Sequence, residues 1–199
     1  KQLEKWILIV NCPIFLLFFL FPGAFINILF GPTYLAAENS LRFLVVGFFF
    51  YSLSLVSSSL IEMIGKSKLI LINILSISIF NLVLNILLVP RYGISGAAFS
   101  TMMSYILLCL ILFLQVKHYV SIIPIRKKMM RVVLSLIPPT ILLIYLKQLV
   151  QINLISMILL GLLFVFLYIL LIFLTKSLDK NDLMILEAVK KKISNSGGS

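Results

Sequence analysis

The chain has 199 residues, of which 62% are hydrophobic and 12% charged, with 17 Lys and Arg against 6 Asp and Glu. A soluble domain is only about 45–50% apolar and about 25% charged, so this composition excludes a water-soluble globule and indicates a membrane protein. The net charge of +11 does not indicate a nucleic-acid binder, because the cations form no continuous patch.

Six apolar stretches are long enough to cross a bilayer, whose core of about 30 Å takes roughly 20 residues of helix. In chain order they are Trp6–Phe30, Leu41–Ile64, Leu69–Val89, Gly93–Val116, Val132–Val150 and Ile152–Leu174. In the fifth stretch Pro138 and Pro139 interrupt the pattern, and we expect Lys147, near its end, to extend to the lipid headgroups. The sequence therefore predicts an all-α polytopic membrane protein with six transmembrane helices.

The basic residues test this count independently, because Lys and Arg gather in cytoplasmic loops close to the ends of spans. All but three of the 17 fall on the flanks of one side, and the exceptions are Arg42, Arg91 and Lys147. This alternation predicts that both ends of the chain are cytoplasmic. Most of the net charge then serves orientation and contact with anionic lipids.

The N-terminus reads Lys-Gln-Leu-Glu-Lys and is followed by an apolar stretch too long for a signal peptide. We expect the chain to be part of a longer protein. A complete protein of six spans is the alternative.

A very short turn joins the third and fourth predicted spans. Pro90 is expected to end one helix, and Gly93 to permit the reversal. Small residues then recur every four positions, at Gly96, Ser100 and Ser104, a spacing that lets helix backbones approach closely. The sequence therefore predicts a tightly packed helical hairpin.

The hairpin also carries a longer pattern, Asn-x-x-x-Asn-x-x-Leu-x-Pro-x-Tyr-Gly-x-x-Gly-Ala-Ala-x-x-Thr. Its residues are Asn81, Asn85, Leu88, Pro90, Tyr92, Gly93, Gly96, Ala97, Ala98 and Thr101. Before it, the first span ends in Leu-Phe-Gly-Pro-Thr-Tyr, and the second leaves the membrane through a Gly-Lys turn at Gly65 and Lys66. In these features the chain resembles the polysaccharide-biosynthesis flippases of O-antigen type, in the multidrug/oligosaccharidyl-lipid/polysaccharide exporter superfamily.

The resemblance implies a fourteen-helix inner-membrane protein with two six-helix lobes and a C-terminal helix pair. Residues 1–116 would be the last four helices of the second lobe, 117–131 a basic cytoplasmic loop, 132–174 the C-terminal pair, and 175–199 a basic amphipathic tail. The intact protein would flip an undecaprenyl-type lipid-linked oligosaccharide for cell-surface glycan export by alternating access. It would form no covalent bond, and we expect no enzyme.

The implied partners are membrane lipids, the lipid-linked oligosaccharide, the missing N-terminal lobe, and a glycan polymerase or glycosyltransferases. We expect no cofactor and no metal, because the single histidine, His118, has no cysteine or carboxylate nearby in the sequence. Two alternatives stay open. One is a multidrug or cation antiporter of the same superfamily, and the other is a six-span membrane scaffold or assembly subunit.

Polar side chains inside apolar spans are the candidates for substrate contact, since they cost free energy unless paired or facing a cavity. Ser78, Asn81 and Asn85 share one face of the third span. They would either bond sugar hydroxyls in a cavity or form hydrogen bonds to neighbouring helices.

Two charged residues of the second span are also candidates. Glu62 lies four residues before Lys66, so it forms either a local ion pair or a gating or proton-coupling carboxylate. Arg42 opens the same span and would either grip a pyrophosphate or extend to lipid headgroups.

The remaining expectations concern lipid contacts and thiols. The basic residues expected at lipid headgroups are Arg126, Lys127, Lys128, Lys190, Lys191 and Lys192. Cys12 and Cys109 lie in apolar runs and are expected to be small buried residues rather than a disulfide.

Overall fold

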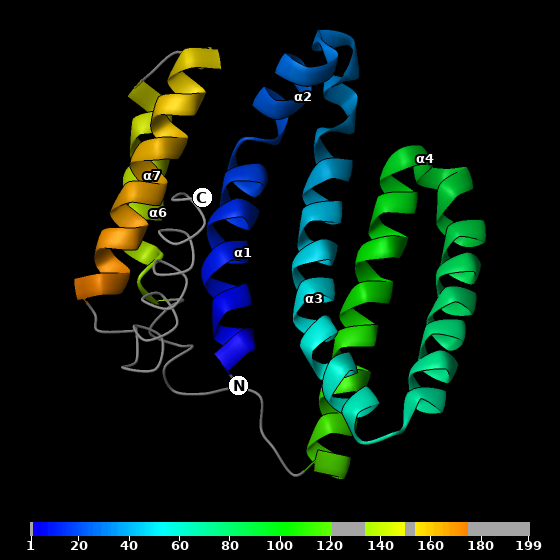
Figure 1. Cartoon of the computed structure of the whole chain (residues 1–199). Helices are drawn as coiled ribbons and strands as arrows, with labels where there is room; N and C mark the ends of the chain where they lie inside the picture. The colour runs from blue at the N-terminus through cyan, green and yellow to red at the C-terminus, as the bar shows by residue number, and fades with distance from the viewer. Residues whose placement is uncertain (1, 121–133, 150–153, 175–199) are drawn as a thin grey trace, which may run out of the picture.

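The computed structural model describes residues 2–120, 134–149 and 154–174, which are almost entirely helical and contain no strand (Figure 1). The elements in chain order are α1 (Gln2–Leu20), α2 (Pro22–Phe30), the 3₁₀ helix η1 (Pro32–Ala37), α3 (Glu38–Met63), α4 (Ser67–Val120), α6 (Ile137–Leu149) and α7 (Leu154–Leu174). The expected all-α membrane fold is confirmed. The six basic residues expected at lipid headgroups lie outside the described residues.

Helix α4 contains the expected hairpin. Its 54 residues form two antiparallel arms, 67–92 and 94–120, that reverse at Gly93 (Figure 1). Gly93 has φ 56° and ψ −132°, a backbone conformation that residues with a Cβ atom rarely adopt. The expectation that Pro90 ends the first arm is wrong, because Pro90 lies inside the helix. A proline keeps a helical φ and removes one hydrogen bond, so the helix ends only where φ becomes positive.

The first predicted span is broken. α1 and α2 meet at Phe21, whose φ of −121° and ψ of 39° are not helical, and the two helices are bent by 78°. Pro22 occupies the first position of α2, where its missing N–H has no helical partner in any case. The span predicted over Trp6–Phe30 is thus two helices, of which α1 runs along α3 (Figure 1).

The number of spans depends on how bent helices are counted. By length and composition, α3, α4 and α7 each suffice to cross a membrane, and the bent α1–α2 pair makes a fourth. The two arms of α4 supply two of the six predicted stretches. α6 has only 13 residues, and Pro138 and Pro139 lie in its first turn rather than interrupting it, since that position tolerates their missing N–H groups.

The described helices pack in two groups. α3 and both arms of α4 form the hairpin unit, whose buried apolar residues are Ile61, Ile70, Ile77, Leu108, Leu112 and Val116. α1, α6 and α7 form the apolar cluster, whose buried residues are Leu8, Cys12, Phe21, Leu136, Leu143, Leu160, Phe164, Tyr168 and Ile172. α1 also packs on α3, where the Phe15 and Phe49 ring centroids are 4.9 Å apart. Cys12 and Cys109 are buried and free, as expected.

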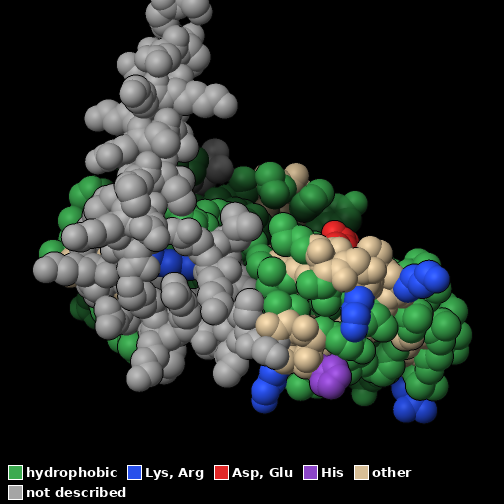
Figure 2. Space-filling view, turned by 60° about the horizontal axis from the view of Figure 1, so that its bottom comes forward, with side chains coloured by type: hydrophobic (Ala, Val, Ile, Leu, Met, Phe, Trp, Pro, Cys, Tyr) green, Lys and Arg blue, Asp and Glu red, His purple; other side chains and the backbone are tan. Residues whose placement is uncertain are grey.

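The two ends of the bundle differ in charge. The start of α1, the α3–α4 turn and the end of α4 lie together at one end, which we call the lysine end because it carries Lys66, Lys68 and Lys117 (Figure 1). In an oblique view that brings this end forward, several Lys and Arg side chains are visible, and one lies next to the chain's only histidine (Figure 2). The Gly93 reversal lies at the opposite end. The described elements therefore alternate in direction as the basic residues predict.

Candidate functional site: a hydroxyl-lined groove between α3 and α4

The hairpin unit is held together by unusually close backbone contacts. A Cβ atom placed on Gly96 would lie 2.5 Å from the carbonyl oxygen of Leu88, on the facing arm of α4. A Cβ on Gly47 of α3 would lie 3.0 Å from the Cα of Met102. Real Cβ contacts are wider, so only glycine fits at Gly96 without a shift of the backbone. The small residues predicted to permit close packing do so.

Amide side chains join the two arms of α4. Asn81 Nδ2 donates to Ser104 Oγ at 3.1 Å, and Asn85 Nδ2 donates to Asn81 Oδ1 at 2.9 Å. Asn73 and Gln115 exchange two hydrogen bonds, of 2.7 and 3.0 Å. Asn81 is thus engaged in a bond to a neighbouring helix, one of the two roles left open for it. The Asn73–Gln115 pair was not predicted from the sequence, although both amides stand out within apolar runs.

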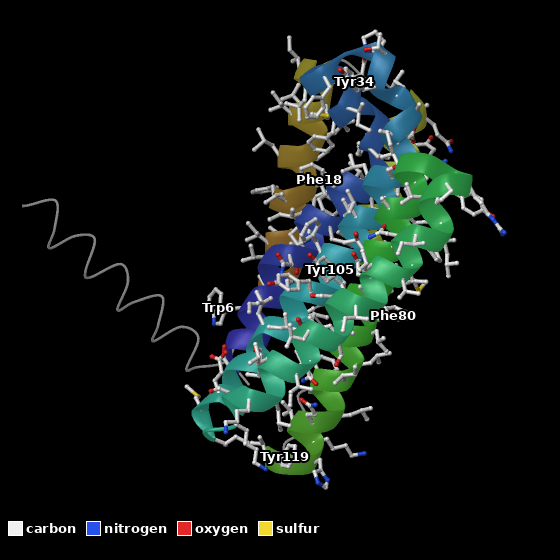
Figure 3. The ribbon with its side chains drawn as sticks, turned by 90° about the vertical axis from the view of Figure 1, so that its right-hand side faces the viewer. Trp6, Phe18, Tyr34, Phe80, Tyr105 and Tyr119 are labelled. Atoms are coloured by element: carbon white, nitrogen blue, oxygen red, sulfur yellow. The ribbon has the colours of Figure 1, made fainter. Side chains whose placement is uncertain are left out.

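A groove of about 270 Å³ opens between α3 and the two arms of α4. Hydroxyl groups contributed by all three helices line it, and the other lining residues are Leu and Ile. The hydroxyl-bearing residues are Tyr51, Ser54, Ser58, Ser78 and Tyr105. Tyr105 lies between the ends of the bundle marked by Tyr34 and Tyr119 (Figure 3), so the groove is at intermediate depth. The ring centroids of Tyr51 and Tyr105 are 4.8 Å apart.

Some hydroxyls of this region are bonded within their own helix. Ser54 donates to the Tyr51 carbonyl at 2.6 Å, and the exposed Ser78 donates to the Ile74 carbonyl at 2.8 Å. Both hydroxyl oxygens can still accept a hydrogen bond from a ligand. Ser78 is therefore placed at the groove, whereas Asn81 bonds the other arm of α4 and Asn85 bonds Asn81 within its own arm.

Two buried side-chain oxygens of the hairpin unit are unsatisfied. Ser57 Oγ and Asn85 Oδ1 have no hydrogen-bond partner within the described residues. Ser57 is fully buried and precedes the groove residue Ser58 on α3. Buried polar atoms in native proteins almost always have a partner, supplied by protein or by water. The hairpin unit therefore retains hydrogen-bonding capacity that its own side chains do not use.

Glu62 extends the polar face of α3 toward the lysine end. Together with Tyr51, Leu55 and Ser58 it follows the helical spacing i, i+4, i+7 and i+11, which places it on the groove side of α3. The expected ion pair with Lys66 is absent from the described residues. Lys66 Nζ instead lies 3.4 Å from the centre of the Tyr119 ring, because the turn at Gly65 directs Lys66 toward the second arm of α4. The exposed Glu62 carboxylate is free of a local ion pair.

Arg42 lies far from this groove, near the opposite end of α3. Its Nη2 is 2.6 Å from Glu38 Oε1, one turn earlier on the same helix. Both side chains are roughly 40% exposed, at 40% and 38%. The structure therefore does not bring Arg42 together with Glu62 or Ser78. Across the described residues, no group of three or more His, Cys, Asp or Glu side chains is arranged to hold a metal ion.

Comparison with known proteins gives two partial matches. Over 102 residues, 51% of this chain, the sequence is 38% identical to an uncharacterized membrane protein of Methanocaldococcus jannaschii, covering 20% of that protein. Over 105 residues, 52% of this chain, it is 32% identical to a Shigella flexneri protein named "Putative O-antigen transporter", covering 25% of it. The aligned part thus spans no more than a quarter of either relative. No family model and no solved structure matches the chain.

Proposed function

We propose that this chain is part of a transporter that moves a lipid-linked oligosaccharide across a membrane for export to the cell surface. The observation that carries the proposal is the hydroxyl-lined groove with Glu62 on the same face, inside a chain of which 62% is hydrophobic. Polar groups within membrane helices mark the paths of polar substrates, since they are costly elsewhere. The partial match to a protein named as an O-antigen transporter supports the same substrate class.

The chemistry of the groove suits a sugar. Ser and Tyr hydroxyls both donate and accept hydrogen bonds, so they complement sugar hydroxyls without demanding one orientation. Transport needs binding weak enough to be reversed, and neutral hydroxyls provide weaker hydrogen bonds than charged groups do. We assign the sugar contacts to Ser58, Ser78 and Tyr105, and a gating contact at the lysine end to Glu62.

The intact transporter would contain further helices, including an N-terminal lobe that completes the path. Alternating access would arise from movement of one lobe against the other around the groove. We place the protein in the inner membrane with the lysine end in the cytoplasm, as the distribution of basic residues supports. An undecaprenyl-type lipid, and a glycan polymerase or glycosyltransferases, are the proposed substrate carrier and partners.

Deleting the gene of the intact protein tests this function. The expected result is accumulation of lipid-linked repeat units on the cytoplasmic face, reversed by the wild-type gene. Normal delivery of lipid-linked glycan to the outer leaflet, in a strain with no redundant flippase, would contradict the proposal.

A cation-coupled antiporter of small molecules is the second candidate, because the exposed Glu62 carboxylate is free to bind a proton or cation. Glu62→Gln separates the two functions when the intact protein is assayed in vesicles. An antiporter loses proton- or cation-driven efflux of a small cationic dye, whereas the proposed flippase shows no such efflux in either form.

A further inference from the structure

The break between α1 and α2 leaves backbone groups without their helical partners inside a membrane segment. Phe21 N still bonds the Leu17 carbonyl at 3.0 Å, and Phe25 N bonds the Phe21 carbonyl at 3.1 Å. Between them the helical ladder stops, since Pro22 has no N–H and the chain bends by 78°. In lipid, such freed carbonyls must find a partner.

Lys147 of α6 supplies that partner. Its Nζ donates to the Leu20 carbonyl oxygen at 2.7 Å, although the two residues are 127 positions apart. The same ammonium lies 5.1 Å from the centre of the Phe21 ring, within range of a cation–π attraction. Leu20 is the last residue of α1, and cations are favoured at helix C-termini. The expectation that Lys147 extends to lipid headgroups is therefore wrong, because a nearer acceptor is present.

The hydrogen bond between Lys147 and Leu20 is directional, whereas the side chains around it are apolar. Phe21 at the break, Leu143 of α6 and Phe164 of α7 are each no more than 3% exposed. Apolar side chains against lipid tails tolerate sliding and rotation, because no strong hydrophobic force separates one position from another. A single charge-assisted hydrogen bond fixes the height at which α6 meets α1.

We propose that Lys147 is a positioning residue that holds the first span in its bent form and docks the C-terminal helix pair at the break. The bond occupies the last carbonyl of α1, which in a continuous helix would accept from the N–H four residues later. Loss of the ammonium therefore frees α2 to change its angle to α1. Where the proposed function holds, this makes the bend a part of the transport cycle; the structural role itself does not depend on that function.

Distance measurements between spin labels test the structural role without any transport. Labels at the exposed positions Val10 on α1 and Asn27 on α2 report the bend in the intact protein in detergent or lipid nanodiscs. K147M keeps an unbranched apolar side chain, one atom shorter than lysine, and removes the donor, whereas K147R retains a cation that can donate. K68M, at the exposed Lys68 of the lysine end, is the matched control.

We predict a narrow distance distribution for wild type, K147R and K68M, and a broadened or lengthened one for K147M. A wild-type distribution in K147M, or equal broadening in K68M, would overturn the proposal. Pro22→Ala provides a second test, which does not depend on the folding of the K147M single variant. Alanine restores the N–H that a continuous helix needs at this position. P22A should stay bent while Lys147 is present and straighten only in the P22A/K147M double variant. Straightening of P22A alone would show that proline, not lysine, holds the bend.

Translocation of a lipid-linked oligosaccharide in vesicles is the second readout. K147M should lower the rate several-fold, and K68M should not. If even the wild-type protein fails to translocate, the proposed function falls while the distance result still decides the role of Lys147. If wild type translocates and K147M does so at the same rate, the link between the bend and transport is overturned.

Discussion

The hairpin unit combines its buried Ile, Leu and Val residues with close contacts through glycine, serine and amide groups, whereas the apolar cluster packs through large side chains such as Phe164 and Tyr168. In the hairpin unit a Cβ on Gly96 would collide with the facing backbone, while a Cβ on Gly161 of α7 would lie 4.0 Å from the nearest side-chain atoms of Leu17. Lipid tails are as apolar as leucine, so the burial of apolar surface between helices stabilises neither group. One group uses backbone proximity and hydrogen bonds, and the other uses interlocking shape together with one lysine.

The largest expected difference between the two regions is in their response to added methyl groups. Gly96→Ala should destabilise the protein by about 1–3 kcal/mol, the usual cost of overpacking, because the new Cβ meets the Leu88 carbonyl. Gly161→Ala should be neutral or stabilising by about 0.4–1 kcal/mol, since alanine fits there and favours helix. Unfolding in denaturing detergent, followed by circular dichroism, measures both. Equal effects of the two substitutions would remove the distinction between the regions.

Removal of a large side chain should instead affect the apolar cluster and spare the hairpin unit. Phe164→Ala should destabilise by about 2 kcal/mol, below the 3–5 kcal/mol typical of soluble cores, because lipid tails can refill part of the space. The loss should loosen α7 against α1 and leave the hairpin unit intact. Hydrogen exchange measured separately for peptides of α4 and α7 would show this. Increased exchange confined to α4 would contradict the separation of the two groups.

A smaller effect is expected from the amide pair between the arms of α4. A double-mutant cycle with Asn73→Leu and Gln115→Leu should give a coupling free energy of about 1 kcal/mol, near the upper part of the range for such bonds in membranes. The pair exchanges two hydrogen bonds, so each single substitution leaves the other amide unpaired. Additive single effects would show that the pair does not couple the arms.

The parts of the fold that follow local rules were predictable from the sequence. The apolar lengths predicted the helices, the distribution of lysines predicted their alternation, and the glycine and serine spacing predicted the close hairpin. The reversal at Gly93 was predicted as well, and only the helix end expected at Pro90 was wrong, because a positive φ rather than a proline turns the chain back here.

Long-range contacts were not predictable. The sequence spacing around Pro22 marks a weak point in the first span, but nothing near it indicates that Lys147, 127 residues later, donates to Leu20. The groove likewise depends on three helices meeting. A helical repeat on α3 carries Ser58 and Glu62, yet the hydroxyls of Ser78 and Tyr105 join them only in the folded protein. Sequence spacing shows which residues share one face of a helix, but not which helix packs against that face.

The most direct test of the central claim is a pair of neighbouring substitutions on α3. Ser58 lines the groove, whereas the exposed Ser59 does not and bonds the Leu55 carbonyl of its own helix at 3.0 Å. The intact protein, reconstituted in phospholipid vesicles, is assayed for translocation of a fluorescently labelled undecaprenyl-linked oligosaccharide. We predict that Ser58→Leu lowers the rate roughly tenfold, which corresponds to about 1.4 kcal/mol, while Ser59→Leu retains the wild-type rate. Equal rates for the two variants would contradict a transport path through this groove.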